Sequence, residues 1–182
     1  MGSKEKVRRK FLLIRQRRYF NTGDNFFKPL IKIIDAKKKR NISLYYPSNH
    51  EVNTLNLFKL LENRKNISIS LPKILKNRAM NFIKWKLFQP LMVNSYGFVE
   101  PLVKGKKMNP DLIVVPLLAY DKFHNRLGYG KGYYDKFLTK YLKKNKNTLT
   151  IGLAFSFQRY KKIPTSKFDK KLDYILTEKG IF

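Results

Sequence analysis

Residues 126–135 read RLGYGKGYYD and form the stretch of the chain best suited to binding phosphate. Three glycines alternate there with larger residues, between an apolar run at 112–119 and a helical pattern. Glycine lets a backbone approach a ligand closely, and the N–H groups that begin a helix point toward it. Arg126 and Lys131 add two cations and Asp135 adds a carboxylate. These groups predict a site for a nucleoside triphosphate and magnesium.

The glycine spacing alone does not identify a nucleotide site. It departs from the GxxxxGK[ST] pattern of a P-loop and from the GxGxxG pattern of dinucleotide-binding folds. A tight connection between a strand and a helix therefore stays open as an alternative for this stretch.

Two further charged groups lie at the ends of predicted elements. Lys4 and Arg8 are four residues apart and share one face of a helix predicted over residues 4–19, which a solvated basic helix explains equally well. Glu51 follows a predicted strand and precedes a helix. A carboxylate at that position stabilises the helix start, and this capping role is the favoured local interpretation.

The residue types limit the possible metal chemistry. The chain has no cysteine, which excludes disulfides, thiolate zinc sites and cysteine nucleophiles. His50 and His124 are its two histidines, too few for a histidine-based metal site. Asp169 and Asp173 lie four residues apart, ahead of a predicted final strand.

Length and composition predict one globular domain spanning residues 1–182. Hydrophobic residues make up 43% of the chain and aromatic residues 14%, which excludes general disorder. No apolar run approaches the roughly 18 residues that a membrane span needs, and no signal-peptide pattern opens the chain. These features predict a soluble, cytoplasmic protein that does not associate with membranes, and we expect a monomer.

The positive charge has two competing explanations. Lys plus Arg number 40 and Asp plus Glu number 12, which gives a net charge of +28. Such a charge favours nucleic acid as a partner. However, lysine occurs in nearly every segment, and Lys, Asn, Ile, Tyr and Phe all have AT-rich codons, so genome composition explains the excess equally well. Weak, non-specific binding to polyanions is expected in either case.

Apolar patterning predicts strands that alternate with helices. The expected strands are 42–46, 67–71, 80–85, 112–119, 149–155 and 174–177; the expected helices are 4–19, 25–38, 52–63 and 131–143. This alternation predicts an α/β fold of three layers, with a mainly parallel sheet and helices on both faces. Ligands of such sheets bind beyond the carboxyl ends of the strands, so Glu51 and the glycine run can line one crevice.

The whole string is more specific than its parts. RLGYGKGYYD, following a strand that ends PLLAYD, resembles the signature of 5-formyltetrahydrofolate cyclo-ligases, also called 5,10-methenyltetrahydrofolate synthetases. The likeness extends from residue 4 to about residue 180, and includes the opening Lys-x-x-x-Arg, a Gly-aliphatic-x-Glu-Pro turn at 97–101 and the four-spaced aspartates. Two positions depart from the pattern: His124 stands where relatives usually have glycine, and Lys131 where many have a third glycine.

The resemblance implies an ATP-dependent ligase that needs Mg²⁺ and closes 5-formyltetrahydrofolate to 5,10-methenyltetrahydrofolate, giving ADP and phosphate. In that reaction the γ-phosphoryl group moves to the formyl oxygen, and N10 of the folate attacks the resulting iminophosphate. The substrate is expected with or without a polyglutamate tail.

The resemblance also implies a role for each matching residue. ATP would be bound by Lys4, Arg8, Arg126, Gly128, Gly130, Lys131, Gly132, Tyr133 and Tyr134, with Arg126, Lys131 and Tyr133 acting on the transferring phosphate. The folate would contact Tyr46, Glu51, Trp85 and Tyr129, although a core position for Trp85 stays open. Magnesium would be held by Asp135 and Asp169, with Asp173 as a weaker alternative.

Two other functions remain open from the sequence. In a small basic nucleic-acid-binding protein, the glycine and aromatic run would stack bases and the N-terminal helix would follow phosphates. The second alternative is a catalytically inactive relative that binds folate or nucleotide and has a regulatory role. The retained charged residues argue against this alternative.

Overall fold

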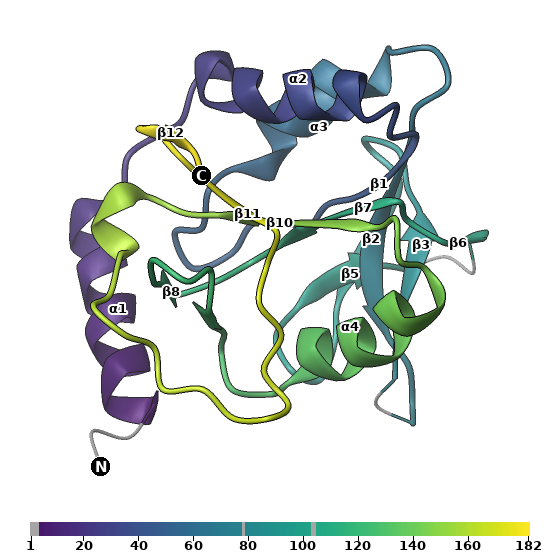
Figure 1. Ribbon diagram of the computed structural model, residues 1–182. Coiled ribbons are helices and arrows are strands. Elements are labelled where there is room, and N and C mark those ends of the chain that lie inside the picture. Colours follow the sequence, from purple (N-terminus) through teal and green to yellow (C-terminus); the bar gives the residue numbers. More distant parts are fainter. Residues whose placement is uncertain (1–3, 78, 103–104) are drawn as a thin grey trace.

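The computed structural model describes residues 4–77, 79–102 and 105–182, and an eight-stranded sheet lies at its centre (Figure 1). The strand order is β12-β11-β10-β7-β1-β2-β3-β6. The strands are β1 (Asn41–Ser43), β2 (Ser68–Ile74), β3 (Met80–Lys84), β6 (Lys107–Met108), β7 (Leu112–Val115), β10 (Leu149–Leu153), β11 (Tyr174–Thr177) and β12 (Gly180–Ile181).

The five central strands run parallel, and the edge strands run antiparallel. β11, β10, β7, β1 and β2 form the parallel part, while β12 at one edge and β3 and β6 at the other pair antiparallel. All four residues of β7 are fully buried, as expected of a strand covered on both faces. The predicted, mainly parallel sheet is therefore confirmed.

Helices cover both faces of the sheet (Figure 1). On one face lie the 3₁₀ turn η1 (Asp24–Phe27), α2 (Lys28–Ala36) and α3 (Thr54–Glu62), which bury Phe27, Leu30 and Phe58 in the larger core. On the other face lies α4 (Tyr133–Lys144), which buries Leu138 in a second core. This arrangement confirms the three-layer α/β prediction.

Helix α1 (Lys4–Arg18) stands beside the sheet (Figure 1). It packs Val7 and Phe11 into a third, small core together with Leu118 and Leu127. Leu12 on this helix is exposed, whereas the face that packs inward includes the buried Arg15.

Five of the six predicted strands end at other residues in the structure, and two of these differences involve proline. The apolar run at 112–119 is not one strand, because β7 ends at Val115 and Pro116 lacks the N–H that would continue its ladder. The chain instead forms a separate hairpin of β8 (Ala119–Tyr120) and β9 (Arg126–Leu127). Conversely, β2 runs through Pro72, where the prediction ended it. β2 pairs with β1 only as far as Ser70. At Pro72 the edge of β2 that faced β1 is no longer paired, so no strand there requires the N–H that proline lacks.

A second hairpin, which the patterning did not predict, lies near the sheet. It consists of β4 (Leu91–Val93) and β5 (Val99–Pro101). The buried carboxylate of Glu100 accepts hydrogen bonds from the Ile74 backbone N–H and the Asn94 side chain, which ties the hairpin to β2. No helix among the described residues is long and apolar enough to cross a membrane.

Candidate active site

A cavity of about 280 Å³ opens where β1 and β7 end. These two strands are neighbours and parallel, so the segments that follow them meet at one edge of the sheet. The cavity is lined by every site residue predicted from the sequence except Trp85 and the alternative metal ligand Asp173: Lys4, Arg8, Tyr46, Glu51, Arg126, Gly128, Tyr129, Gly130, Lys131, Gly132, Tyr133, Tyr134, Asp135 and Asp169.

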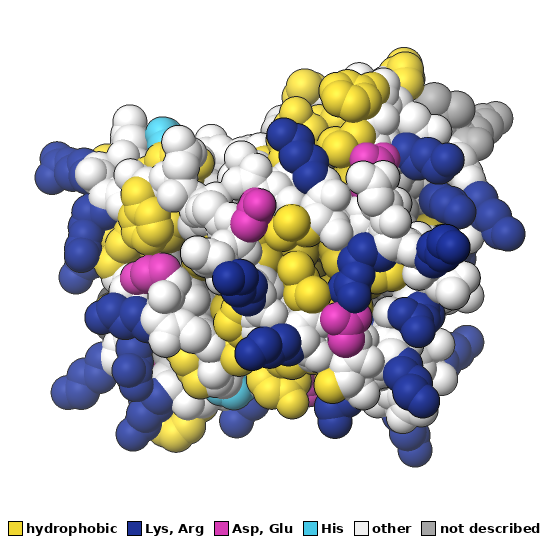
Figure 2. All heavy atoms as spheres, turned by 90° about the horizontal axis from the view of Figure 1, so that it is seen from above, with side chains coloured by type: hydrophobic (Ala, Val, Ile, Leu, Met, Phe, Trp, Pro, Cys, Tyr) yellow, Lys and Arg dark blue, Asp and Glu magenta, His cyan; other side chains and the backbone are white. Residues whose placement is uncertain are grey.

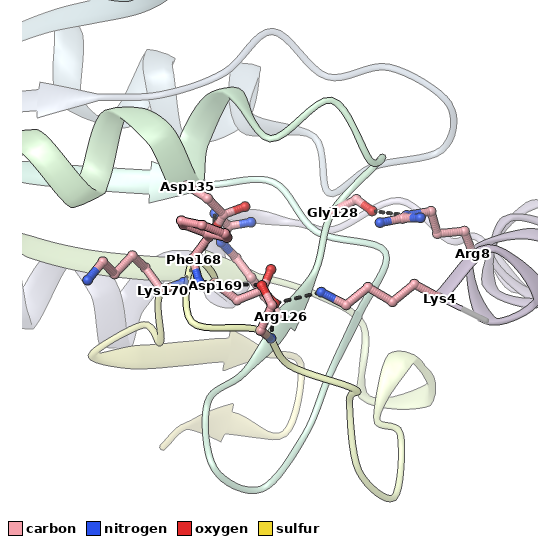
Figure 3. A network of polar contacts seen from close by, with 9 residues as sticks. Lys4, Arg8, Arg126, Gly128, Asp135, Phe168, Asp169 and Lys170 are labelled. Carbon is pink, nitrogen blue, oxygen red and sulfur yellow. Dashed lines mark hydrogen bonds and ion pairs between the residues drawn. The ribbon is translucent and has the colours of Figure 1, made fainter. Parts of the chain in front are cut away.

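One end of the cavity combines the glycine run with helix α1. Arg8 Nε donates a hydrogen bond to the Gly128 carbonyl oxygen at 2.9 Å, as Figure 3 shows. Gly130 has φ of +100°, and a Cβ there would lie 3.2 Å from the Arg8 guanidinium carbon. Gly132 has φ of +71° and precedes the first residue of α4. Side chains at Gly130 and Gly132 would strain the backbone, and at Gly130 one would also crowd Arg8.

Two ion pairs face this end of the cavity. Lys4 Nζ lies 2.6 Å from the Asp169 carboxylate, and Arg126 Nη2 lies 2.8 Å from the Asp135 carboxylate. The backbone N–H of Lys170 donates to Asp135 at 3.1 Å, so the residue after Asp169 contacts Asp135 directly (Figure 3). The two carboxylates that are predicted metal ligands are thus brought together from α4 and from the segment before β11.

The donors around Asp169 keep it ionised. Partial burial pushes its pKa upward, but hydrogen bonds from Lys4 and from the Ser166 N–H and hydroxyl outweigh that effect. The pKa of Asp169 therefore lies below its usual range. Asp169 is a carboxylate throughout the neutral pH range.

The donor set fits Mg²⁺ held jointly with phosphate. Mg²⁺ prefers oxygen ligands and is usually bound through one or two carboxylates plus substrate phosphates. The described residues contain no group of three or more acidic, histidine or cysteine side chains able to hold a metal alone. Asp135 and Asp169 thus supply what a nucleotide-linked magnesium needs, but not a metal site independent of nucleotide.

A second part of the cavity wall is organised around Glu51. Its Oε2 accepts hydrogen bonds from the Ser48 N–H at 2.9 Å and the Ser48 hydroxyl at 3.3 Å. Its Oε1 accepts one from the Tyr129 hydroxyl at 2.5 Å. The cap of α3 is Asn53, whose side chain accepts from the Leu55 N–H. Glu51 therefore does not cap the helix, and its carboxylate faces the cavity.

Burial raises the pKa of Glu51 above its usual value, and the nearby Arg15 guanidinium opposes that rise. The carboxyl is only 6% exposed, so the charged form loses most of its hydration. Glu51 differs in this respect from Asp169, whose hydrogen-bond donors outweigh its burial.

Two buried polar atoms beside the cavity have no hydrogen-bond partner among the described residues: Arg126 Nε and the Tyr134 hydroxyl. Buried polar groups are nearly always paired, and exceptions in a cavity wall mark places where a ligand can supply the partner. Burial also raises the pKa of the Tyr134 phenol, so this hydroxyl stays a neutral donor.

Aromatic rings line the rest of the wall. Tyr133 makes edge contacts with Tyr96 and Phe98 of the β4–β5 hairpin, at ring-centroid distances of 5.6 and 6.4 Å. Tyr46 lines the cavity beside Glu51, and Lys131 lies exposed at its rim.

Two predicted residues are placed elsewhere. Trp85 is 4% exposed and packs edge-on against Phe58 in the larger core, so the prediction that it contacts the folate is not supported and the core alternative holds. The Asp173 carboxylate accepts hydrogen bonds from the Thr150 N–H and hydroxyl, both at 2.8 Å, and joins β10 to the start of β11. Asp173 therefore has a structural role in this geometry, in keeping with its place as the weaker candidate for a magnesium ligand.

Sequence reasoning missed Arg15. Its guanidinium is 1% exposed and donates to the Tyr129 hydroxyl at 2.6 Å. It lies seven residues beyond Arg8, close to two helical turns, and this spacing was the available signal. The basic character of the whole helix concealed it.

Comparisons with known proteins identify a family for this chain. The model of the 5-formyltetrahydrofolate cyclo-ligase family matches residues 1–178. The chain is 30% identical over 151 residues to the 5-formyltetrahydrofolate cyclo-ligase of Haemophilus influenzae, covering 80% of each protein. It is 31% identical over 140 residues to that of Mycoplasma genitalium, covering 75% of this chain and 72% of the relative.

Solved structures show the same fold. The NMR structure of 5,10-methenyltetrahydrofolate synthetase from Aquifex aeolicus matches with a TM-score of 0.76 and 30% identity, covering 100% of this chain and 92% of the other. A 5,10-methenyltetrahydrofolate synthetase from Mycoplasma pneumoniae matches with a TM-score of 0.73 and 24% identity, covering 96% and 98%. The family match over nearly the whole length, the 30% identical relatives and the shared fold show that this chain is an enzyme of the 5-formyltetrahydrofolate cyclo-ligase family.

Proposed function

We propose that this protein uses ATP and Mg²⁺ to close 5-formyltetrahydrofolate to 5,10-methenyltetrahydrofolate, releasing ADP and phosphate. One observation carries the proposal. A single cavity combines a cationic, glycine-lined end that includes Asp135 and Asp169 with a second end built on the buried Glu51 carboxylate. The first end suits a magnesium-bound triphosphate, and the second suits a ring with N–H donors, as in a pterin.

The chemistry asks the protein mainly to position its substrates. The formyl oxygen of the folate is a poor leaving group, and transfer of the γ-phosphoryl group converts it to a good one. N10 then attacks the formyl carbon of the iminophosphate and loses its proton to solvent, the C–O bond to the phosphorylated oxygen breaks, and phosphate leaves. Such phosphoryl transfer depends on alignment and on neutralising the charge of the phosphate oxygens.

The cations of the cavity are suited to that neutralisation. Lys4, Arg8, Arg126 and Lys131 all lie along the end that carries the glycine run. The glycine backbone lets phosphate approach, and the N-terminus of α4 adds the positive end of a helix dipole. Tyr133 lies at the start of α4, where its side chain would meet the transferring phosphate.

Asp135 and Asp169 are the residues that would hold magnesium together with phosphate oxygens. Magnesium there would neutralise charge on the triphosphate during transfer. Without a cation between them, these carboxylates would repel the nucleotide.

The folate would be recognised at the Glu51 end. A carboxylate accepts hydrogen bonds from the adjacent ring N–H and amino groups of a pterin, and Tyr46 and Tyr129 line the cavity beside it. We propose that the protein is a cytoplasmic monomer and that it accepts the folate with or without a polyglutamate tail. Size-exclusion chromatography with light scattering tests the monomer.

The test is the ATP- and magnesium-dependent appearance of methenyltetrahydrofolate absorbance when purified protein is mixed with 5-formyltetrahydrofolate. We expect product only when ATP, magnesium and folate are all present, with Asp135→Asn as the matched inactive control. Binding of folate and ATP without turnover would instead support an inactive, regulatory relative.

The geometry does not favour the nucleic-acid alternative. Tyr129, Tyr133 and Tyr134 are partly buried in the wall of a cavity, whereas stacking platforms for single strands present open aromatic faces. Weak polyanion binding remains a property expected of the surface charge, separate from the activity.

A further inference from the structure

Arg15 is a buried charge whose direct partners are neutral. One of its terminal nitrogens donates to the Leu117 carbonyl oxygen at 3.2 Å and the other to the Tyr129 hydroxyl at 2.6 Å. Its Nε has no partner among the described residues. A guanidinium removed from water costs free energy unless negative charge lies near it. The hydrogen bonds of Arg15 connect it to such a charge, the carboxylate of Glu51.

The path from Arg15 to Glu51 runs through one hydroxyl. Tyr129 has a single O–H proton and donates it to Glu51 Oε1, so it can only accept from Arg15. The direction of the chain is therefore fixed: Arg15 donates to Tyr129, and Tyr129 donates to Glu51. A positive charge lies at one end and a carboxylate at the other, both buried.

Helix α1 thereby supports two parts of the cavity wall. Residues 4, 8 and 15 fall within about 40° of one another on a helix of 3.6 residues per turn, so their side chains share one stripe. Arg8 holds the Gly128 carbonyl and Arg15 holds the hydroxyl of the next residue, Tyr129. The same helix thus supports the glycine run and, through Tyr129, the Glu51 acceptor.

We propose that Arg15 is a positioning residue for folate binding, which holds Tyr129 in place and balances the negative charge of Glu51, the acceptor for the ring N–H groups. The proposal rests on the proposed function, because it assumes that Glu51 receives the pterin. Arg15 itself does not line the cavity and touches neither substrate.

The surroundings of Glu51 make Arg15 the group that matters for its charge. The titratable groups that face it are Arg15 from α1, Tyr129 from the glycine run, Tyr45 from the segment after β1 and Tyr134 from α4. The three tyrosines are neutral at physiological pH, since burial raises the pKa of each phenol. Burial also raises the pKa of Glu51, and Arg15 is the cation that counteracts it.

The first test needs no activity. The chain has five glutamates, so NMR titration of protein labelled with ¹³C at the glutamate carboxyl carbons can follow Glu51, assigned by its loss in Glu51→Gln. Arg15→Met removes the charge but keeps an unbranched side chain that fills the space. We expect the proton affinity of Glu51 to rise at least tenfold in Arg15→Met, to stay near the wild-type value in Arg15→Lys, and to be unchanged in Arg17→Met, whose residue is exposed on the same helix.

The second test measures binding by titration calorimetry. In Arg15→Met the dissociation constant for 5-formyltetrahydrofolate should rise about tenfold at pH 7, and the defect should shrink as pH rises and Glu51 ionises. ATP affinity should stay within about twofold of wild type. Tyr129→Phe removes the hydroxyl that connects Arg15 to Glu51 and leaves the sequence of α1 unchanged. It should also weaken folate binding.

The outcomes separate the two claims. An unchanged Glu51 titration in Arg15→Met overturns the inference, as does a binding loss equal at all pH values and equal in Arg15→Lys, because packing alone would explain that. If wild-type protein neither binds nor cyclises the folate, the proposed function fails. The NMR titration still decides in that case whether Arg15 sets the charge of Glu51.

Discussion

Lys4 and Asp169 form an ion pair of 2.6 Å, although they lie 165 positions apart in the chain. Arg126 and Asp135 form a second pair at 2.8 Å on the same cavity. Each aspartate proposed to hold magnesium is thus paired with a cation proposed to hold phosphate. In the proposed function, binding of magnesium and ATP exchanges these partners, so that the cations turn to phosphate and the carboxylates to the metal.

This exchange predicts that magnesium and ATP bind only together. Magnesium alone must displace two cations from the carboxylates and gains no phosphate ligands, so it should leave the melting temperature unchanged. Magnesium with ATP at 100 times its Kd should stabilise the fold by about 2.7 kcal/mol. For a chain of this size that corresponds to a melting-temperature rise of roughly 5–10 °C. Thermal melts with EDTA, magnesium, ATP and both together provide the check, and a shift with magnesium alone would contradict the exchange.

Lys4→Ala and Arg8→Ala should weaken ATP binding much more than folate binding. Both side chains reach the glycine end of the cavity, and removing either takes a cation from the triphosphate. Isothermal titration with each ligand measures the difference. Lys10→Ala, exposed on the same helix, is the matched control. Unchanged ATP affinity in both variants would mean that α1 has a structural role and does not bind ATP.

Asp135→Asn should lower turnover by roughly two orders of magnitude or more, the scale of lost transition-state charge stabilisation. Asp169→Asn should do likewise. The fold should survive because Asn is nearly isosteric with Asp. Asp173→Asn is the control, since its carboxylate holds Thr150 outside the cavity and should affect melting temperature more than rate. Activity against magnesium concentration distinguishes them, and wild-type magnesium dependence in Asp135→Asn would remove it from the metal site.

Glu51→Gln should raise the KM for folate, leave ATP affinity nearly intact and change how stability depends on pH. Burial raises the Glu51 pKa above 4.5, so in wild type its contribution to stability is present below that pH and is lost as pH rises through the folded-state pKa. Glutamine has no such loss. The unfolding free energy of Glu51→Gln relative to wild type should therefore increase from pH 4 upward. Urea denaturation at several pH values measures it, and a pH-independent difference would mean that Glu51 has an ordinary pKa.

The basic surface should bind DNA or RNA weakly and without sequence preference. Figure 2 shows lysine and arginine side chains distributed over the whole face displayed, rather than gathered in one block. Binding that depends on phosphate neutralisation falls steeply with salt. Fluorescence anisotropy with two unrelated oligonucleotides between 50 and 200 mM salt should show equal affinities that decline together. A preferred sequence at 150 mM salt would indicate a specific nucleic-acid function.

The sequence predicted most of the regular structure because those elements depend on local pattern. β11 begins and ends at the predicted residues, and the predicted helix at 25–38 contains α2, with Pro29 in its first turn. The errors occurred where a neighbouring strand decides the outcome. Pro72 continues β2 only because β1 has already ended, and the apolar run at 112–119 divides at Pro116 into a strand and a hairpin. In both cases the hydrophobic pattern predicts that the residues are buried, but it does not predict which segment they form hydrogen bonds with.

The sequence by itself determined the family, the layered fold and the residues around the cavity, because glycine spacing, charge type and strand order are written along the chain. The tertiary structure decided how those residues pair. Lys4 with Asp169 and Arg15 with Tyr129 are contacts over 165 and 114 positions, which no local pattern encodes. It also placed Trp85 in the core and linked Arg15 to Glu51 through Tyr129. The reason is that burial and electrostatic environment arise from elements that pack together, so a residue's chemistry depends on neighbours that its sequence position does not reveal.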